Sequence, residues 1–430
     1  MHSDTHDYLT CSNCGDSRDT SPDALSESPA CERCGLAMHP VHPWWLDHAT
    51  AYTITAAILF AVTLSFPFLA LKTVGMRQEA SLISGILALA ERGQWLLAAL
   101  VFVTIILIPL LEILVLLYLL IPYRLQRRRA HQVAVFRWLV IVQPWSMLEI
   151  FAVAVLVTMV KLGGDATIVP GVAMFAFFLL VAALMGAYLA MDKSDIWNWL
   201  NPQRRFIHSA EEPTFSCHVC EAEVGRTIIH TSGRCPRCGA RVYERIPNSF
   251  QKTAALILAA SILYIPANVL PMMSYTSFGT TRTDTIFSGV IALISDGLWW
   301  VALVVFIASI MVPIAKLVVL TYLLWLIKKG ATRDFPAQQR LFHSLELIGR
   351  WSMIDVFVVT LLVALVQFGV FGQVEPRGAI VAFGGVVVLT MLATQTFDVR
   401  LLEDAWKNKN SSSEQGSAKN TSQNTINHYD

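Results

Sequence analysis

Long apolar stretches, separated by short polar segments, dominate the chain. They cover residues 50–71, 95–121, 138–160, 169–191, 252–273, 297–327, 342–370 and 378–397. Each is about long enough to cross a bilayer as an α-helix, which needs roughly 20 apolar residues. The apolar segment Ser81 to Ala90 is too short to span, so we expect an interfacial or re-entrant position. The pattern predicts an α-helical polytopic membrane protein with eight transmembrane helices.

The order of polar and apolar positions occurs twice along the chain. The first copy of one apolar segment reads PWSMLEIFAVAVLVTMVK from Pro144, and RWSMIDVFVVTLLVALVQ follows 206 residues later from Arg350. Earlier in each half the offset is 204 residues, which matches Pro67 with Pro271 and Pro109 with Pro313. Two tandem modules therefore arose by duplication, each with four transmembrane helices.

Composition agrees with a membrane protein, at 55% hydrophobic and only 15% charged residues. The net charge of +1 gives no basic domain for nucleic acid. The basic residues gather in the loops after the second and sixth spans, as Arg124, Arg127, Arg128, Arg129 and Arg137, and as Lys328, Lys329, Arg333, Arg340 and Arg350. The positive-inside rule makes these loops cytoplasmic. Both termini are then cytoplasmic, and the even span count predicts parallel repeats related by a pseudo-two-fold axis.

All eight cysteines lie in C-x-x-C pairs outside the apolar runs. They are Cys11, Cys14, Cys31 and Cys34 in the first half, and Cys217, Cys220, Cys235 and Cys238 in the second. Intervals of 16 and 14 residues between pairs are typical of zinc ribbons with four cysteine ligands. Cytoplasmic thiols stay reduced, and a short polar segment needs a metal to fold. We therefore predict two structural zinc sites rather than a redox or sensing function.

Charged residues within the apolar runs are the candidate transport residues. Glu149 and Asp355 hold the same place in the repeated W-S-M segment. Such acids face other helices or a cavity by default, so they are buried partners or part of a transport path. Glu112 corresponds to Lys316, and we hypothesise that these two side chains pair. Lys161 lies near the outer boundary, where snorkelling to the interface is the expected behaviour.

Other positions carry weaker expectations. Pro109 and Pro313 should kink the second and sixth spans, because proline removes a helical hydrogen bond. Asp195 and Asp398, at the inner ends of the last spans, are expected to be solvated. No H-E-x-x-H, P-loop or G-x-S-x-G motif occurs, so we do not expect an enzyme.

The pattern predicts five parts. They are a first zinc ribbon (1–48), a first four-helix module (49–192), a second zinc ribbon (193–250), a second four-helix module (251–405) and a disordered tail (406–430).

The paired ribbons, the four spans after each, and the repeated W-S-M-[LI]-[ED]-[IV]-F resemble the paraquat-inducible protein A family of Gram-negative inner membranes. The resemblance covers about residues 8–405. It implies zinc bound by the eight cysteines and a periplasmic partner built of mammalian-cell-entry (MCE) domains that form a tunnel. It also implies transport of membrane phospholipid between the two membranes, in support of envelope integrity.

The sequence leaves two other functions open. The chain is alternatively a membrane-bound redox or metal-stress sensor that uses its cytoplasmic thiolates, or an anchor that assembles its partner without transporting anything. Duplicated intramembrane acids favour transport over sensing, whereas buried charges also serve helix registry in an anchor.

Overall fold

The computed structural model describes residues 8–10, 17–19, 44–73, 76–129, 131–162, 167–191, 193–201, 214–220, 222–277, 280–295, 297–330, 335–365, 373–402 and 405. Within these ranges, seven helical segments are long and apolar enough to cross a membrane: Trp45–Ser65, Trp95–Arg124, Gln132–Val160, Val172–Ala190, Ser249–Val269, Trp299–Lys329 and Gly378–Thr396. The protein is thus a multi-pass helical membrane protein, as the sequence predicted.

The remaining predicted span, 342–370, is only partly described. Its described part consists of α14 (Phe335–Gly349), the 3-10 turn η6 (Arg350–Met353) and α15 (Ile354–Leu365). Residues 366–372 lie outside the described part of the chain. The count of eight spans therefore stays a prediction.

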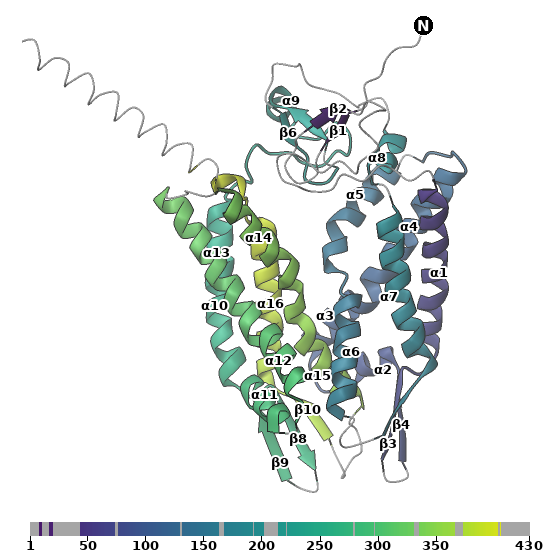
Figure 1. Cartoon of the computed structure of the whole chain (residues 1–430), viewed down its shortest axis with the longest axis vertical. Coiled ribbons are helices and arrows are strands. Elements are labelled where there is room, and N and C mark those ends of the chain that lie inside the picture. The colour runs from purple at the N-terminus through teal and green to yellow at the C-terminus, as the bar shows by residue number, and fades with distance from the viewer. Residues whose placement is uncertain are drawn as a thin grey trace, which may run out of the picture. The chain divides into compact units, whose positions relative to one another are not determined.

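The same series of elements occurs in both halves (Figure 1). The first half contains α1 (Trp45–Ser65), β3 (Leu69–Thr73), β4 (Met76–Ala80), α2 (Leu82–Glu91), α3 (Trp95–Phe102), η2 (Val103–Leu107), α4 (Ile108–Arg124), α5 (Gln132–Val142), η3 (Gln143–Trp145), α6 (Leu148–Leu162), β5 (Thr167–Pro170) and α7 (Val172–Ala190). The second contains α10 (Ser249–Val269), β8 (Met273–Ser277), β9 (Thr280–Asp284), α11 (Ile286–Ser295), α12 (Trp299–Phe306), η5 (Ile307–Met311), α13 (Val312–Lys329), then α14, η6 and α15, β10 (Gln373–Pro376) and α16 (Gly378–Thr396).

The chain forms two compact units. One comprises residues 1–58, 110–145 and 179–244, and the other comprises residues 59–109, 146–178 and 245–430. The five predicted parts and the boundaries between them stay predictions.

Each half carries a three-stranded antiparallel sheet that sequence reasoning missed. The strand orders are β4-β3-β5 and β10-β8-β9. The predicted ends of the first and fifth spans, at residues 71 and 273, are wrong. The helices end earlier, at Ser65 and Val269. Pro67 and Pro271 follow, and a proline disfavours the helical conformation of the residue before it. The chain therefore leaves each helix in an extended conformation and enters β3 or β8.

The short apolar segment after each hairpin is a separate helix, α2 or α11, of ten residues. The side chains of Ser81 and Ser84 cap the start of α2 reciprocally. Gly93 and Gly297 then reverse the chain into the next helix, each at φ +78°, a conformation that favours glycine. Ten helical residues are too few to cross a bilayer, as the length of the apolar segment predicted. The interfacial or re-entrant position of this helix stays a prediction.

A π-helical turn precedes each of the prolines that were expected to kink a span. These turns are η2 and η5, and Pro109 and Pro313 lie just after them. A proline ring in an α-helix clashes with the carbonyl group four residues earlier. The wider π-helical turn relieves that clash, so α4 and α13 continue for 17 and 18 residues.

The two copies of the W-S-M segment pack directly on each other as α6 and α15 (Figure 1). Their contact includes Phe151 and Phe357, with ring centroids 5.6 Å apart and ring planes at 79°. These two phenylalanines are equivalent by the 206-residue offset. Contact between equivalent residues is what a pseudo-two-fold axis produces. The tandem repeat is therefore visible in the packing as well as in the sequence.

Candidate functional site

Two short hairpins bring four cysteines of the second ribbon together. Cys217 and Cys220 follow β6 (Thr214–Ser216), and β7 (Glu223–Gly225) returns antiparallel to it. Cys235 and Cys238 come after α9 (Arg226–Thr231), in a turn closed by an isolated bridge between residues 234 and 241. The two turns, or knuckles, close alike, because the Cys217 N–H donates to the carbonyl five residues on and the Cys235 N–H does the same.

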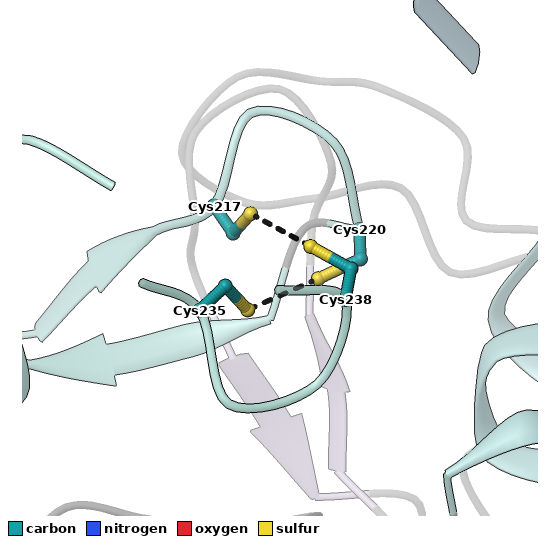
Figure 2. Close-up of side chains that lie close together, drawn as sticks. All are labelled: Cys217, Cys220, Cys235 and Cys238. Atoms are coloured by element: carbon teal, nitrogen blue, oxygen red, sulfur yellow. Dashed lines mark hydrogen bonds between the residues drawn. The ribbon is translucent and has the colours of Figure 1, made fainter. Parts of the chain in front are cut away.

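The four thiols form a compact buried group. Their sulfur atoms all lie within 4.8 Å of one another, and all four residues are buried (Figure 2). The Sγ atoms of Cys217 and Cys238 are 3.6 Å apart, and those of Cys220 and Cys235 are 3.5 Å apart. A tetrahedral zinc site with Zn–S bonds of about 2.3 Å requires sulfur–sulfur distances of about 3.8 Å. The donor set and its geometry thus fit a metal of the zinc type.

The thiols influence one another's ionisation. The hydrogen bond with Cys220 lowers the pKa of Cys217 to about 7. The hydrogen bond with Cys217 in turn raises the pKa of both Cys220 and Cys238. Without a cation, the cluster therefore resists becoming four thiolates, whereas a divalent metal favours that state. All four thiols are free in the structure, without a disulfide among them.

The surface of the second ribbon carries an ion pair beside α9. The Arg226 Nε donates to the Glu244 carboxylate at 2.6 Å, and this hydrogen bond lowers the pKa of that carboxyl group. His230 lies 3.1 Å from the same carboxylate. These groups are exposed, so we assign them no more than a local role.

The first predicted metal site, with Cys11, Cys14, Cys31 and Cys34, lies outside the described residues. Strands β1 (Tyr8–Thr10) and β2 (Ser17–Asp19) pair antiparallel on either side of the first C-x-x-C pair. This hairpin is the counterpart of β6 and β7 at an offset of 206 residues. The first site stays a prediction.

Lys316 and Glu112, equivalent in the repeat, are both buried, each with 1% of its surface exposed. The Lys316 Nζ donates to the Thr390 Oγ1 of α16 at 3.3 Å. Glu112 of α4 has Tyr188 of α7 as a close neighbour. Each charged group thus has a polar neighbour in its own half of the sequence, and the hypothesis that Glu112 and Lys316 pair stays a prediction.

Small and polar residues close around Lys316. A Cβ atom added at Gly349 would lie 2.2 Å from the Lys316 Cε, so the backbone of α14 lies directly against the lysine. The Ser352 hydroxyl donates to the Gly349 carbonyl at 3.1 Å. Ser309, seven residues before Lys316, has a buried hydroxyl without a hydrogen-bond partner among the described residues. Lys316, Thr390 and Gly349 thus form a buried cluster. The sequence singled out Lys316 as a charge in an apolar run, but it did not show that Thr390 and Gly349 contact it.

The other candidate transport residues are placed as follows. Glu149 lies on α6, inside the apolar segment Gln132–Val160, and its side chain is exposed while Leu148 and Ile150 beside it are buried. Asp355 and Lys161 lie on α15 and α6, but their side chains are outside what the structure describes. The transport role of all three stays a proposal.

Asp398 corrects an expectation, because it was expected to be solvated and is only 7% exposed. Its carboxylate accepts hydrogen bonds from the Ile246 N–H at 2.9 Å and the Arg400 N–H at 3.0 Å. The Asp398 N–H donates to the Ser249 hydroxyl, which itself donates to the carbonyl of Thr396. Asp398 thus joins the start of α10 to the end of α16. Sequence patterns did not reveal this structural role, because the donor Ile246 is distant in sequence.

One cavity lies among α2, α3, α6 and α15 in the described structure. Its walls include Phe68, Gly85, Ile105, Phe151 and Thr360, and its volume is about 20 Å³. That volume suits a molecule the size of water. It is far smaller than a lipid, so it does not define a lipid path.

Comparison with known proteins matches most of the chain to one protein family. A family model described as "Paraquat-inducible protein A" matches residues 46–201 and 250–407. The starts of the two matches differ by 204 residues, which is the offset of the duplication. All eight cysteines lie outside both matched regions.

Similar proteins align with almost the whole chain. The "Intermembrane transport protein PqiA" of Escherichia coli is 33% identical over 88% of this chain and 91% of its own length. The "Lipophilic envelope-spanning tunnel protein A" of the same organism is 31% identical over 94% of this chain and 93% of its own. A "Probable intermembrane transport protein" of Haemophilus influenzae is 28% identical over 93% and 95%. No solved structure matches.

Proposed function

Since this chain belongs to the paraquat-inducible protein A family, we propose that it is the membrane subunit of a system that moves phospholipid between the inner and outer membranes. The observation that carries the proposal is similarity along nearly the whole chain to a relative named as an intermembrane transport protein. Another relative's name adds a lipophilic tunnel that spans the envelope. The proposed role is transport and not catalysis.

The proposed setting is the bacterial inner membrane, with both termini and both ribbons in the cytoplasm. The arginine-rich loops support this orientation, because basic residues stay on the cytoplasmic side. The three-stranded sheets would then face the periplasm. There we propose a tunnel protein with MCE domains as the partner that delivers or receives lipid.

The proposed metal is zinc, held by four cysteines in each ribbon. The buried tetrahedral arrangement of Cys217, Cys220, Cys235 and Cys238 supports this at the second site. There the metal would replace the missing hydrophobic core of a small domain. We assign it no part in lipid movement.

The proposed polar elements of lipid handling are Glu149, Asp355 and the buried cluster around Lys316. An exposed carboxylate within a 29-residue apolar segment supports this role for Glu149. Polar groups at this depth are expensive in hydrocarbon, so they usually mark a path for substrate or ions.

The test is purification of the full chain in mild detergent without a reductant, with mass spectrometry of retained lipid. We expect bound phospholipid in the wild type, and less of it in Glu149→Gln and Asp355→Asn. The matched control is Glu375→Gln, which removes an exposed carboxylate from strand β10. Retention of no lipid by the wild type, or equal retention by all variants, would contradict the lipid-handling role.

Metal analysis of the same preparation separates the sensor alternative. A structural ribbon predicts about two zinc ions per chain and loss of protein when a cysteine becomes serine. A sensor predicts that the cysteine variant stays folded and loses only its response. Disulfides in place of zinc would favour the sensor.

A further inference from the structure

The second knuckle of the second ribbon is held by side chains of α5 and of the residue that follows α8. The Asn201 Nδ2, just after α8 (Lys193–Leu200), donates to the carbonyls of Pro236 and Arg237 at 3.3 and 3.1 Å. The Arg137 Nη1 of α5 donates to the carbonyl of Cys238 at 3.2 Å. Three successive carbonyls of the metal-binding turn thus accept hydrogen bonds from two side chains.

Both donors emerge from well-packed positions. Phe136, next to Arg137, packs against Trp197 of α8 with ring centroids 4.6 Å apart, and each has at most 1% of its surface exposed. The α8 indole of Trp199 donates to the side chain of Gln126, which follows α4, at 3.3 Å. The first contact joins α8 to α5, and the second joins α8 to the end of α4. Arg137 and Asn201 are therefore presented to the ribbon from a rigid platform.

Arg137 also meets the knuckle at its glycine. A Cβ atom added at Gly239 would lie 3.3 Å from the Arg137 Nη1. Gly239 has φ +71°, a backbone conformation that favours glycine. Because glycine has no Cβ atom, the Arg137 guanidinium group can also lie close to the turn. The cation thereby lies against the residue that follows the Cys238 ligand.

The close approach of Arg137 places a positive charge near a site that is negatively charged when metal is bound. Four thiolates around a divalent metal carry a net charge of about −2, which is unfavourable at a buried site unless cations or hydrogen-bond donors offset it. Arginine is always charged. The ribbon supplies one such group, since the Arg237 Nη1 donates to the Cys220 carbonyl at 3.4 Å. Arg137 supplies another, from the membrane module.

The second module lacks the same group. By the 206-residue offset of this region, the equivalent of Arg137 is His343, whose side chain is exposed. Histidine lacks the permanently charged guanidinium group of arginine. The duplication therefore places the second ribbon ahead of the second module in sequence, while the arginine of a membrane module that contacts this ribbon belongs to the first module.

We propose that Arg137 and Asn201 are positioning residues of the second metal centre, which the ribbon and the first membrane module form jointly. Asn201 orients the knuckle, and Arg137 both orients it and offsets the charge of the tetrathiolate. Metal binding thereby stabilises the position of α5, the helix that leads into the W-S-M segment. This inference rests on the proposed metal site.

The experiment measures zinc release from the purified full chain to a chromophoric chelator, with alkylation of the released thiols followed by intact mass. Partners of this kind typically change metal affinity by about 10- to 100-fold. We expect Arg137→Gln to release one zinc about 10- to 100-fold faster than the wild type. Asn201→Ala should also release zinc faster. Arg137→Lys should release zinc at close to the wild-type rate, because its positive charge remains. The matched control is Arg127→Gln, which removes an exposed arginine from the neighbouring loop.

The outcomes separate the inference from its premise. A wild-type chain that holds no zinc contradicts the metal site itself. Zinc release from Arg137→Gln and Asn201→Ala at the wild-type rate overturns only the positioning role. If Arg137→Gln does not fold, the zinc release rates of Arg137→Lys and Asn201→Ala decide. Wild-type release rates in both of these variants would then overturn the proposal.

Discussion

The lysine buried in the second module allows a prediction in which stability and function change in opposite directions. Lys316 has 1% of its surface exposed, and its described hydrogen-bond partner is the Thr390 hydroxyl at 3.3 Å. One neutral acceptor compensates poorly for the loss of water around an ammonium group. We expect Lys316→Met, which keeps similar length and volume, to stabilise the fold and to abolish the retention or movement of lipid.

The magnitudes follow from the burial and the single hydrogen bond. Replacement of buried charged groups by well-packed apolar ones is neutral or stabilising by about 1–4 kcal/mol. Thr390→Val removes the acceptor and leaves a buried charged donor unsatisfied, which costs about 1–3 kcal/mol or more. In the Lys316→Met background the same threonine change should cost close to nothing, because only a bond to the helix's own carbonyl of Val387 is lost.

The assay is a double-mutant cycle of thermal unfolding in detergent, followed by tryptophan fluorescence. A coupling of at least about 1 kcal/mol between the two positions is the expected result. Thr158→Val is the matched control, because Thr158 is equally buried and donates to the Ala154 carbonyl of its own helix at 2.8 Å. The reasoning is refuted if Thr390→Val costs the same with and without Lys316, or if Lys316→Met unfolds the protein.

Two glycine comparisons test the fold further. Gly171→Ala should destabilise by about 1–3 kcal/mol, because its Cβ would lie 2.1 Å from the Pro67 carbonyl oxygen, whereas Gly378→Ala meets nothing within 4 Å and should be nearly neutral. Equal melting temperatures for these two variants would contradict the packing argument. Gly93→Ala and Gly297→Ala meet nothing within 4 Å but share φ +78°, so each should cost about 1–2 kcal/mol from the backbone alone. Unequal losses in the two halves would show that the repeated turns are not equivalent.

The membrane helices could be predicted because their signal is local. Twenty consecutive apolar residues have few alternatives to a span, and the duplication is evident from matched prolines and cysteines. The same approach placed the ends of the first and fifth spans too late. Hydropathy continues through Leu69 and Leu71, so the apolar signal concealed the change from helix to strand after Pro67.

The polar contacts between helices and at their ends could not be predicted, because they depend on residues distant in sequence. Thr390 lies 74 residues from Lys316, and Asp398 accepts from a backbone group 152 residues away. Sequence periodicity assigns each residue to a helix but does not state which faces meet. By contrast, the grouping of the four cysteines of the second ribbon could be predicted, because a C-x-x-C pair places both thiols in one turn.

The three-stranded sheets constrain the order in which each module is completed during synthesis. Leu69 pairs with Ala80 in a hairpin of neighbouring residues, but also with Pro170, about a hundred residues later. The second sheet repeats this, with Met273 opposite both Asp284 and Pro376. In each module the hairpin can form as soon as it leaves the translocation channel. The closing strand follows only after the second and third spans have entered the bilayer. Until then β3 or β8 has an unpaired edge, which is open to wrong pairing or proteolysis. In the proposed orientation, a nascent chain interrupted before its closing strand therefore exposes this unpaired edge to the periplasm, where envelope proteases can reach it.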